Sequence, residues 1–237
     1  MKHDKLASEM TKKELAAFID HSVLKPGFTC NEIKKNIQDG IDFGCKTVCV
    51  NPCVLKLANE MTKGTDTQVC VVCDFPFGAS STNSKVLQAE ECCKEGVFEL
   101  DIVANYGLIR SGMWKEVEDD LRAVIETCHK YNTAVKVIFE TDALTMEEVS
   151  KATEIAIIAG TDFVKTSTGF YTGGKSDGAT TKVIQVIMDT AKDRCKIKGS
   201  GGIRTKDHFF ELIDMGIDRM GVGYNSTPVV LEGADEK

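Results

Sequence analysis

The chain has 237 residues, of which 42% are hydrophobic, and a formal net charge of −7 at pH 7. A chain of this length buries a sizeable core, and a single α/β barrel typically has ~250 residues. The acidic balance argues against nucleic acid or an anionic membrane as a partner. No apolar run approaches the ~20 residues of a membrane span, and no apolar segment follows the charged N-terminus. We therefore predict a cytoplasmic protein.

Strand-like and helix-like segments alternate along the chain without a linker. Short apolar runs predict eight strands, at 17–23, 46–51, 69–75, 97–103, 134–140, 162–167, 195–200 and 217–223. Helices are predicted between them, at 29–40, 53–63, 82–95, 112–131, 145–159, 180–193 and 205–215. Thr-x-x-Glu capping boxes mark helix starts at Thr11, Thr29 and Thr145. Gly160 and Gly216 mark helix-to-strand turns.

This strict alternation requires parallel strands covered by helices. With eight strands, the economical architecture is a (β/α)8 TIM barrel, formed by residues 1–237 as a single domain. An open, doubly wound sheet is the alternative. However, no Gly-x-Gly-x-x-Gly motif follows a predicted strand, so the sequence favours the closed barrel.

Polar residues recur with a period of two near the carboxyl ends of the predicted strands. Such a period places each set on one face of its strand. On the interior face of a barrel, these side chains would converge at the mouth where barrel enzymes keep their active sites. The residues are Asp20, Ser22, Thr47, Cys49, Asn51, Asp101, Asn105, Lys136, Glu140, Lys165, Ser167, Lys198 and Ser200.

Lys165 lies in an apolar run, Asp162 to Lys165, which precedes the hydroxyl-rich turn Thr166 to Gly169. Lysine is almost never fully buried without a reason. Burial disfavours the ammonium form of a lysine and leaves an amine that can attack a carbonyl. The sequence therefore predicts Schiff-base chemistry on a small phosphorylated carbonyl compound, against the alternative of a lysine that reaches water from a strand end.

Lys198 falls on the strand next to Lys165 in the predicted barrel, at a matching depth. Two adjacent ammonium groups disfavour each other, so one of the two lysines is expected to lose its proton. Asp101 is predicted to transfer protons while the Schiff base forms and collapses. The alternative is a buried ion-pair network with a purely structural role, but such networks add little net stability.

Two glycine-bearing loops follow the seventh and eighth predicted strands, at 199–205 and 221–226. Loops in these two places commonly bind phosphate in barrels, and glycine lets the backbone approach an anion. No His, Asp or Glu cluster has metal-ligand spacing, so we predict no metal and no cofactor. Cys70 and Cys73 alternate on a strand and should face opposite sides, while His21 is predicted to pack rather than to catalyse.

Several segments, in order along nearly the whole chain, resemble the deoxyribose-phosphate aldolases of the class I, Schiff-base type. They are Ile19–Pro26, Val48–Pro52, Asp74–Gly78, Glu99–Val103, Lys136–Thr141, Lys165–Gly169, Gly178–Thr180 and Gly201–Thr205. The Lys-Thr-Ser-Thr-Gly motif at Lys165 is the most specific of them. The resemblance implies a (β/α)8 barrel that uses no metal and forms homodimers or homotetramers.

By this resemblance, Lys165 forms the Schiff base, Lys198 perturbs it, and Asp101 relays protons. Asp20 and Cys49 would line the pocket, and backbone amides of the glycines would approach the phosphate. The predicted substrate-binding residues are Asp20, Ser22, Cys49, Thr168, Gly169, Gly201, Gly202, Gly221 and Gly223.

The chain departs from the family pattern in the loop after the eighth strand. The family usually has Gly-x-Ser-Ser, whereas this chain has Gly221-Val222-Gly223-Tyr224. Ser22 also stands where threonine is usual. The missing hydroxyls leave open whether Asn225, Ser226 or the Gly223 amide contacts the phosphate in their place.

The resemblance implies reversible cleavage of 2-deoxy-D-ribose 5-phosphate to D-glyceraldehyde 3-phosphate and acetaldehyde, in deoxyribonucleoside catabolism. One alternative is a Schiff-base aldolase with a different donor, which donor screening would distinguish. Another is a catalytically idle barrel that binds sugar phosphates, which any turnover of deoxyribose phosphate would exclude.

Overall fold

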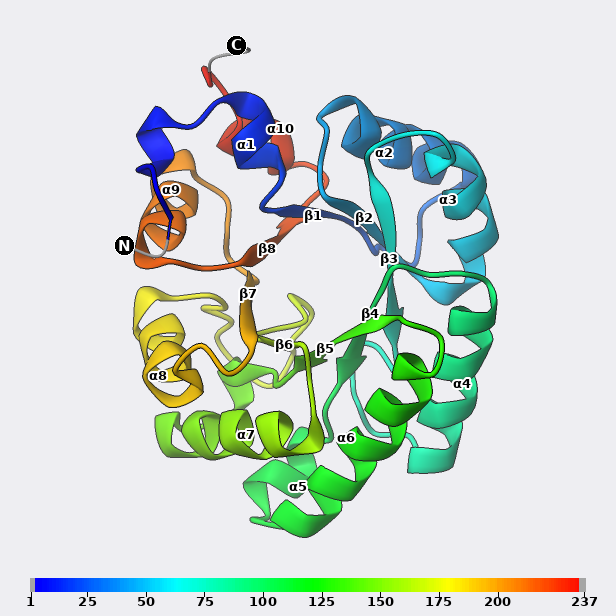
Figure 1. The fold of residues 1–237 in the computed structure, drawn as a ribbon, viewed down its shortest axis with the longest axis vertical. Coiled ribbons are helices and arrows are strands. Elements are labelled where there is room, and N and C mark those ends of the chain that lie inside the picture. Colours follow the sequence, from blue (N-terminus) through cyan, green and yellow to red (C-terminus); the bar gives the residue numbers. More distant parts are fainter. Residues whose placement is uncertain (1–2, 235–237) are drawn as a thin grey trace.

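A computed structural model describes residues 3–234 of the chain. Eight strands form a closed barrel in which each strand pairs with the next, and β8 pairs with β1 (Figure 1). All pairs are parallel. The strands are β1 (Ile19–Val23), β2 (Thr47–Val50), β3 (Gln68–Cys73), β4 (Glu99–Val103), β5 (Ala134–Ile138), β6 (Phe163–Lys165), β7 (Lys196–Ser200) and β8 (Arg219–Gly223). The predicted (β/α)8 barrel is confirmed.

Helices surround this barrel and cover the outer face of the sheet (Figure 1). They are α1 (Lys12–Ala16), α2 (Cys30–Asp42), α3 (Leu55–Thr62), α4 (Thr82–Lys94), α5 (Tyr106–Arg110), α6 (Trp114–His129), α7 (Met146–Ala159), α8 (Thr181–Ala191), α9 (Lys206–Met215) and α10 (Thr227–Val230). Three short 3-10 turns lie at Ala7–Glu9, Pro52–Val54 and Thr141–Ala143. Within residues 3–234, every helix is too short or too polar to cross a bilayer.

Local sequence signals explain where several helices begin and end. The capping boxes at Thr11, Thr29 and Thr145 all form, each with its glutamate side chain bonded back to the threonine backbone. Gly160 and Gly216 cap α7 and α9 in the left-handed conformation, with φ of +97° and +100°. These signals predicted the main helices correctly, but the short helices α5 and α10 were missed.

Three predicted strands extend two residues too far at their carboxyl ends, and one of them is β6, which ends at Lys165 rather than at residue 167. The observed β3 ends at Cys73 and β5 at Ile138, whereas the predicted strands reached residues 75 and 140. Asp74 and Glu140 have φ of +49° and +58°, a left-handed conformation that a strand cannot continue through. The chain therefore turns from strand to loop at these residues.

The two faces of the sheet have different chemistry. Outward side chains such as Val71, Leu100 and Val137 pack with the helices in one large apolar core. The interior instead contains buried lysines, and Lys136, Lys165 and Lys198 are among the largest fully buried side chains of the described residues. Interiors of such barrels are usually filled by branched apolar residues. The charged interior therefore indicates a functional site inside the barrel.

Candidate active site

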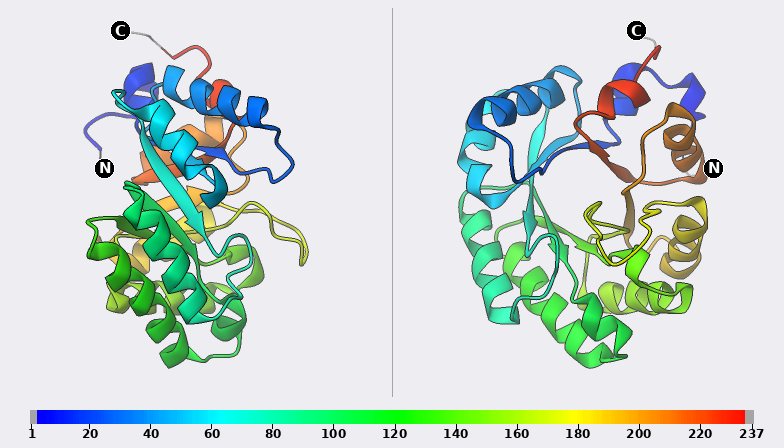
Figure 2. Two further views of the ribbon diagram at one scale, coloured as in Figure 1. Left: turned by 90° about the vertical axis from the view of Figure 1, so that its right-hand side faces the viewer. Right: turned by 180° about the vertical axis from the view of Figure 1, so that it is seen from behind.

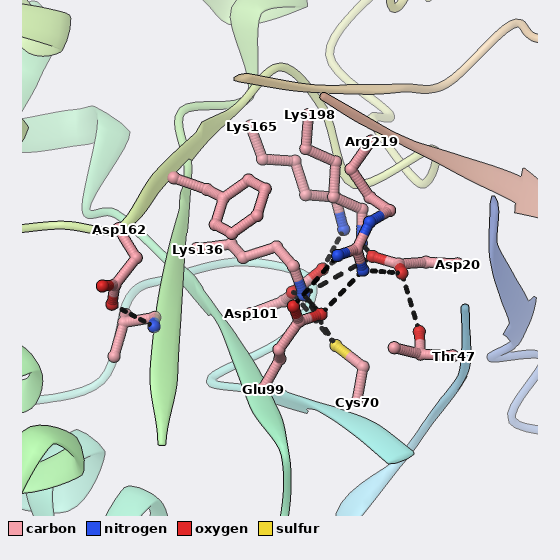
Figure 3. A network of polar contacts seen from close by, with 12 residues as sticks. Asp20, Thr47, Cys70, Glu99, Asp101, Lys136, Asp162, Lys165, Lys198 and Arg219 are labelled. Atoms are coloured by element: carbon pink, nitrogen blue, oxygen red, sulfur yellow. Dashed lines mark hydrogen bonds and ion pairs between the residues drawn. The ribbon is translucent and has the colours of Figure 1, made fainter. Parts of the chain in front are cut away.

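Seven charged side chains from six strands, β1 and β4 to β8, meet inside the barrel (Figure 3). Parallel pairing aligns Lys165 with Lys198, Asp101 with Lys136, and Lys198 with Arg219. The placement of Lys165 and Lys198 at equal depth on adjacent strands is thus confirmed. The group, called the charged cluster below, consists of Asp20, Glu99, Asp101, Lys136, Lys165, Lys198 and Arg219.

Asp101 lies at the centre of the charged cluster. Its Oδ2 accepts hydrogen bonds from Lys165 Nζ at 2.7 Å and from Lys198 Nζ at 2.8 Å. Its Oδ1 accepts from Lys136 Nζ at 2.9 Å and from the Cys70 thiol at 3.1 Å. Burial alone would raise the pKa of Asp101, but the three lysines outweigh it and hold that pKa well below its usual range. Asp101 is therefore a carboxylate that all three lysines share.

Arg219 binds two carboxylates in the deeper part of the charged cluster. Its guanidinium donates to Asp20 Oδ1 at 2.6 Å and to Glu99 Oε2 at 2.9 Å. Lys136 Nζ lies 2.7 Å from Glu99 Oε2 and 3.4 Å from Asp20 Oδ2. Burial disfavours the charge on Lys136, but the Asp101 and Asp20 carboxylates raise its pKa well above the ordinary value. Lys136 is thus a permanent ammonium in the interior.

Replacing Lys136 by methionine should lower the free energy of unfolding by about 3–5 kcal/mol at pH 7. The substitution removes the ammonium that contacts Glu99 at 2.7 Å and Asp101 at 2.9 Å, and so leaves these two buried carboxylates without their Lys136 partner. Urea denaturation followed by circular dichroism measures the change. Lys35→Met is the control, because its pair with Asp39 is solvent-exposed and should contribute little. Equal small losses in both variants would show that the buried network adds no stability.

A cavity of about 280 Å³ opens above the charged cluster at the carboxyl ends of the strands. Lys165 reaches its wall, whereas Asp101 and Lys198 lie deeper and are fully buried. The predicted binding residues that line it are Ser22, Thr168, Gly169, Gly201, Gly202, Gly221 and Gly223. Of the three lysines in the charged cluster, Lys165 is thus the one that a molecule in the cavity can contact.

Asp20 and Cys49 do not line this cavity, although the sequence placed them in its wall. Asp20 is fully buried and contacts Lys198 Nζ at 2.5 Å and the Thr47 hydroxyl at 2.8 Å. Cys49 is also fully buried, and a hydrogen bond with Cys70 lowers the pKa of its thiol. The Asp20 carboxylate is held in the charged cluster, and Cys49 packs in a small apolar cluster against Phe75 and Phe170. Their roles in binding remain predictions.

Backbone amides in the cavity wall are free to bind an anion. Within residues 3–234, the N–H groups of Gly169, Gly201 and Gly202 donate no hydrogen bond. All three glycines have positive φ, between +75° and +83°. A side chain at Gly202 would also clash, since a Cβ there would lie 2.8 Å from the Asp177 carbonyl oxygen. Positive φ therefore favours glycine at these three positions of the cavity wall, where the amides have no partner.

The loop between β6 and α8 projects beyond the barrel mouth (Figure 2) and is fixed at both ends. Glu140 accepts hydrogen bonds from the Thr168 amide and hydroxyl at its start. Asp142 accepts from the Asp177 amide at 2.9 Å and the Gly178 amide at 3.0 Å at its end. Burial raises the pKa of Glu140. These contacts hold Thr168 and Gly169 in the cavity wall.

Two sets of potential metal-binding atoms converge in the interior: Cys49, Cys70 and Asp101, and Asp20, Cys70 and Glu99. Their spacing in the sequence did not reveal them, because the members come from different strands. The Lys136 ammonium lies 3.3 Å from Cys70 Sγ and contacts the carboxylates of both sets. A fixed positive charge beside these atoms disfavours a metal cation.

We expect full activity after exhaustive chelation, because the Lys136 ammonium already balances the charge of these donor atoms. The measurement is turnover after dialysis against a strong chelator, with metal content determined by mass spectrometry. A loss that zinc or another divalent ion restores would contradict the prediction and would place a metal in the site.

The structure bears out the opposite orientation of Cys70 and Cys73 and the packed position of His21. Cys70 faces the interior, whereas Cys73 faces the apolar core outside the barrel. None of the ten cysteines, all within residues 3–234, forms a disulfide. His21 is buried and its Nδ1 lies 2.8 Å from the Thr227 hydroxyl. Burial lowers its pKa to about 4, so His21 is neutral at pH 7.

Comparison with known proteins places this geometry in a family. The sequence model of the DeoC/LacD family aldolases matches residues 14–225. The chain belongs to the DeoC/LacD aldolase family. This match covers all eight strands and therefore every residue of the charged cluster.

Similar proteins are found across bacteria and archaea. A protein named deoxyribose-phosphate aldolase from Staphylococcus saprophyticus is 40% identical over 206 residues, which cover 87% of this chain and 91% of the relative. One with the same name from Thermococcus kodakarensis is 39% identical over 230 residues, 96% of this chain and 100% of the relative. These relatives confirm the resemblance found in the sequence.

Solved structures agree with the barrel. One described as "QR15, an Aldolase" has a TM-score of 0.84 at 36% identity and covers 92% of this chain and 95% of its own. A deoxyribose phosphate aldolase from Aeropyrum pernix, described as having a unique tetrameric structure, has a TM-score of 0.84 at 26% identity and covers 94% and 91%. The barrel of this chain is thus the DeoC/LacD aldolase barrel.

Sequence reasoning gave no role to two residues of the charged cluster, Glu99 and Arg219. Both carried a usable signal, because Glu99 shares the strand face of Asp101, and Arg219 shares that of Gly221. They lie at the amino-terminal ends of β4 and β8, away from the mouth on which the prediction concentrated. A search for charged residues on the interior face along the whole length of each strand, and not only near its carboxyl end, would have identified Glu99 and Arg219.

Proposed function

We propose that this protein is a deoxyribose-phosphate aldolase, which reversibly cleaves 2-deoxy-D-ribose 5-phosphate to D-glyceraldehyde 3-phosphate and acetaldehyde through a Schiff base on Lys165. The observation that carries the proposal is the position of the Lys165 amine. It lies in the cavity wall, 2.7 Å from Asp101, with Lys198 behind the same carboxylate oxygen.

Charge balance explains why Lys165 is the nucleophile. The charged cluster contains four basic groups (Lys136, Lys165, Lys198 and Arg219) and three carboxylates (Asp20, Glu99 and Asp101). If all were ionised, one positive charge would remain uncompensated in the interior, which is costly. Release of one proton from a lysine removes that charge.

The lysine with the least carboxylate support gives up this proton most easily. Lys136 contacts three carboxylates, and Lys198 contacts Asp20 at 2.5 Å and Asp101 at 2.8 Å. Lys165 contacts Asp101 alone and shares that oxygen with Lys198. Burial disfavours the Lys198 ammonium, but Asp101 and Asp20 together raise its pKa above the ordinary value. Lys198 is therefore held as an ammonium, and Lys165, which reaches the cavity, is the lysine placed to react as the amine.

The reaction begins when the Lys165 amine attacks C1 of the open-chain aldehyde and forms a carbinolamine. Asp101, 2.7 Å from Lys165 Nζ, is within reach to relay the protons that let water leave and the iminium form. A base then removes the C3 hydroxyl proton, the C2–C3 bond breaks, and its electron pair forms the enamine. Glyceraldehyde 3-phosphate departs. Protonation of the enamine at C2 and hydrolysis of the iminium release acetaldehyde and restore Lys165.

The phosphate of the substrate would bind the free amides of Gly169, Gly201 and Gly202. These amides lie in the same cavity wall as Lys165, at the end of the barrel where phosphate sites are usual. We also propose a homodimer or homotetramer in the cytoplasm, in line with the tetrameric relative and with ten cysteines that form no disulfide.

The proposal is tested by incubation with 2-deoxy-D-ribose 5-phosphate and separate quantification of both products. Equal amounts of acetaldehyde and glyceraldehyde 3-phosphate should appear. In the reverse direction, acetaldehyde should be preferred over ketone donors such as dihydroxyacetone phosphate. Absence of turnover, or a preference for a ketone donor, would overturn the proposal.

A further inference from the structure

Two cations stand at the rim of the cavity without a carboxylate partner. Lys25 follows β1, and Arg204 lies in the loop between β7 and α9. Among residues 3–234, neither side chain forms an ion pair. The free amides of Gly201 and Gly202 line the same cavity. This end of the cavity therefore combines positive charge with unused hydrogen-bond donors, which suits a dianion.

Lys25 is exposed, yet its side chain is held in one place. Its Nζ donates a hydrogen bond to the Tyr224 hydroxyl at 3.0 Å. The ammonium lies 5.2 Å from the centre of the Tyr224 ring and 5.9 Å from that of Phe28. These two rings meet edge to face at 5.1 Å. Cation–π contact and the hydrogen bond thus keep a flexible lysine over the cavity and reduce the entropy lost when it binds a ligand.

Tyr224 is the first residue after β8, and Gly223, the last residue of that strand, has no side chain that could contact an anion. The Tyr224 amide is already used, because it donates to the Ser22 carbonyl oxygen at 3.2 Å. Its side chain therefore contributes through the contact with Lys25 rather than through a serine-like hydroxyl on the anion. Through Tyr224, the uncharged loop after β8 thereby holds the positive charge of Lys25 at the cavity.

We propose that Lys25 binds the phosphate of the substrate and that Tyr224 is the positioning residue that holds its ammonium over the cavity. This inference rests on the proposed function and extends it to specificity. Lys25 makes the charge-assisted contact, and Gly201 and Gly202 supply neutral amide donors. The pair joins residues 199 positions apart in the sequence, which closure of the barrel through β1 and β8 brings together.

The test compares kcat/KM for 2-deoxy-D-ribose 5-phosphate with kcat/KM for unphosphorylated 2-deoxy-D-ribose. In Lys25→Gln, the ratio of the two values should fall about 10- to 100-fold, since a hydrogen bond to a charged group is lost. Most of the loss should appear as a higher KM for the phosphorylated sugar. Tyr224→Phe keeps the ring and removes the hydroxyl, so the ratio should fall by a smaller factor.

Lys46→Gln is the matched control. Lys46 also lies over an aromatic ring, 5.3 Å from the centre of Phe98, but it precedes β2 at the opposite end of the barrel. The control should keep the wild-type ratio. An unchanged ratio in Lys25→Gln, or an equal loss on both sugars, would overturn the proposal.

Binding of inorganic phosphate, measured by isothermal titration calorimetry, separates this inference from the proposed reaction. Wild type and Lys46→Gln should bind phosphate alike, and Lys25→Gln should bind it at least about tenfold more weakly. A wild type that binds phosphate through Lys25 but turns over neither sugar would contradict the proposed function alone. Equal phosphate affinity in all three proteins would contradict the role of Lys25.

Discussion

Lys165→Met should lose turnover of deoxyribose 5-phosphate by at least about 1,000-fold, because no other amine can take over the covalent step. Lys136 and Lys198 are held by two or more carboxylates each and lie below the cavity. In the wild type, borohydride reduction in the presence of acetaldehyde should attach one ethyl group, and peptide mapping should place it on Lys165.

The same variant should remain folded. Removal of Lys165 leaves three basic groups and three carboxylates in the charged cluster, so its charges balance. The free energy of unfolding should therefore be unchanged or higher, in contrast to Lys136→Met. Lys196→Met on the neighbouring strand serves as the labelling control, because Lys196 is exposed and lies over Phe163. Ethylation of Lys198 or of a surface lysine in wild type would show that Lys165 is not the nucleophile.

The fold could be predicted from the sequence because its signals are local. Alternating apolar runs, capping boxes and glycine turns each depend on a few neighbouring residues, and eight repeats of strand and helix leave few architectures. The strand ends were predicted less accurately, although Asp74 and Glu140 carried a usable signal, because aspartate and glutamate are depleted in strands. The short helices α5 and α10 also lack a long enough periodic pattern.

The site could be predicted only in part, because which side chains reach the cavity depends on contacts made across the closed barrel. The alternation of side chains along each strand placed Asp101, Lys165 and Lys198 on the interior face of the barrel. The observed strand register and the contacts of Asp101 with both lysines confirm that these side chains meet. Asp20 has the same parity and pairs with Gly221, which lines the cavity, but Lys198 and Arg219 hold its carboxylate inside the charged cluster. Contacts such as that of Lys25 with Tyr224 require the closed barrel and have no signal in a single sequence.

Lys198→Leu should slow Schiff-base formation at neutral pH and allow partial recovery as the pH rises. The variant leaves three basic groups and three carboxylates, so no excess charge drives a proton from Lys165. Lys165 would then share the Asp101 oxygen with no competing ammonium and would remain protonated. An upward shift of two pH units in the midpoint of Schiff-base formation would reduce the neutral amine ~100-fold at a given pH below both midpoints.

Asp101→Asn should shift the same midpoint in the opposite direction. This substitution removes a carboxylate, so the charged cluster has four basic groups for two carboxylates, and loss of a lysine proton becomes more favourable. The rate at the optimum should still fall, because asparagine cannot relay protons. The measurement for both variants is the pH profile of single-turnover Schiff-base formation with acetaldehyde, trapped by borohydride. Opposite shifts are what charge balance requires. Two unshifted profiles would mean that desolvation alone sets the reactivity of Lys165, and Lys198 would then be left with a role in proton transfer or substrate binding.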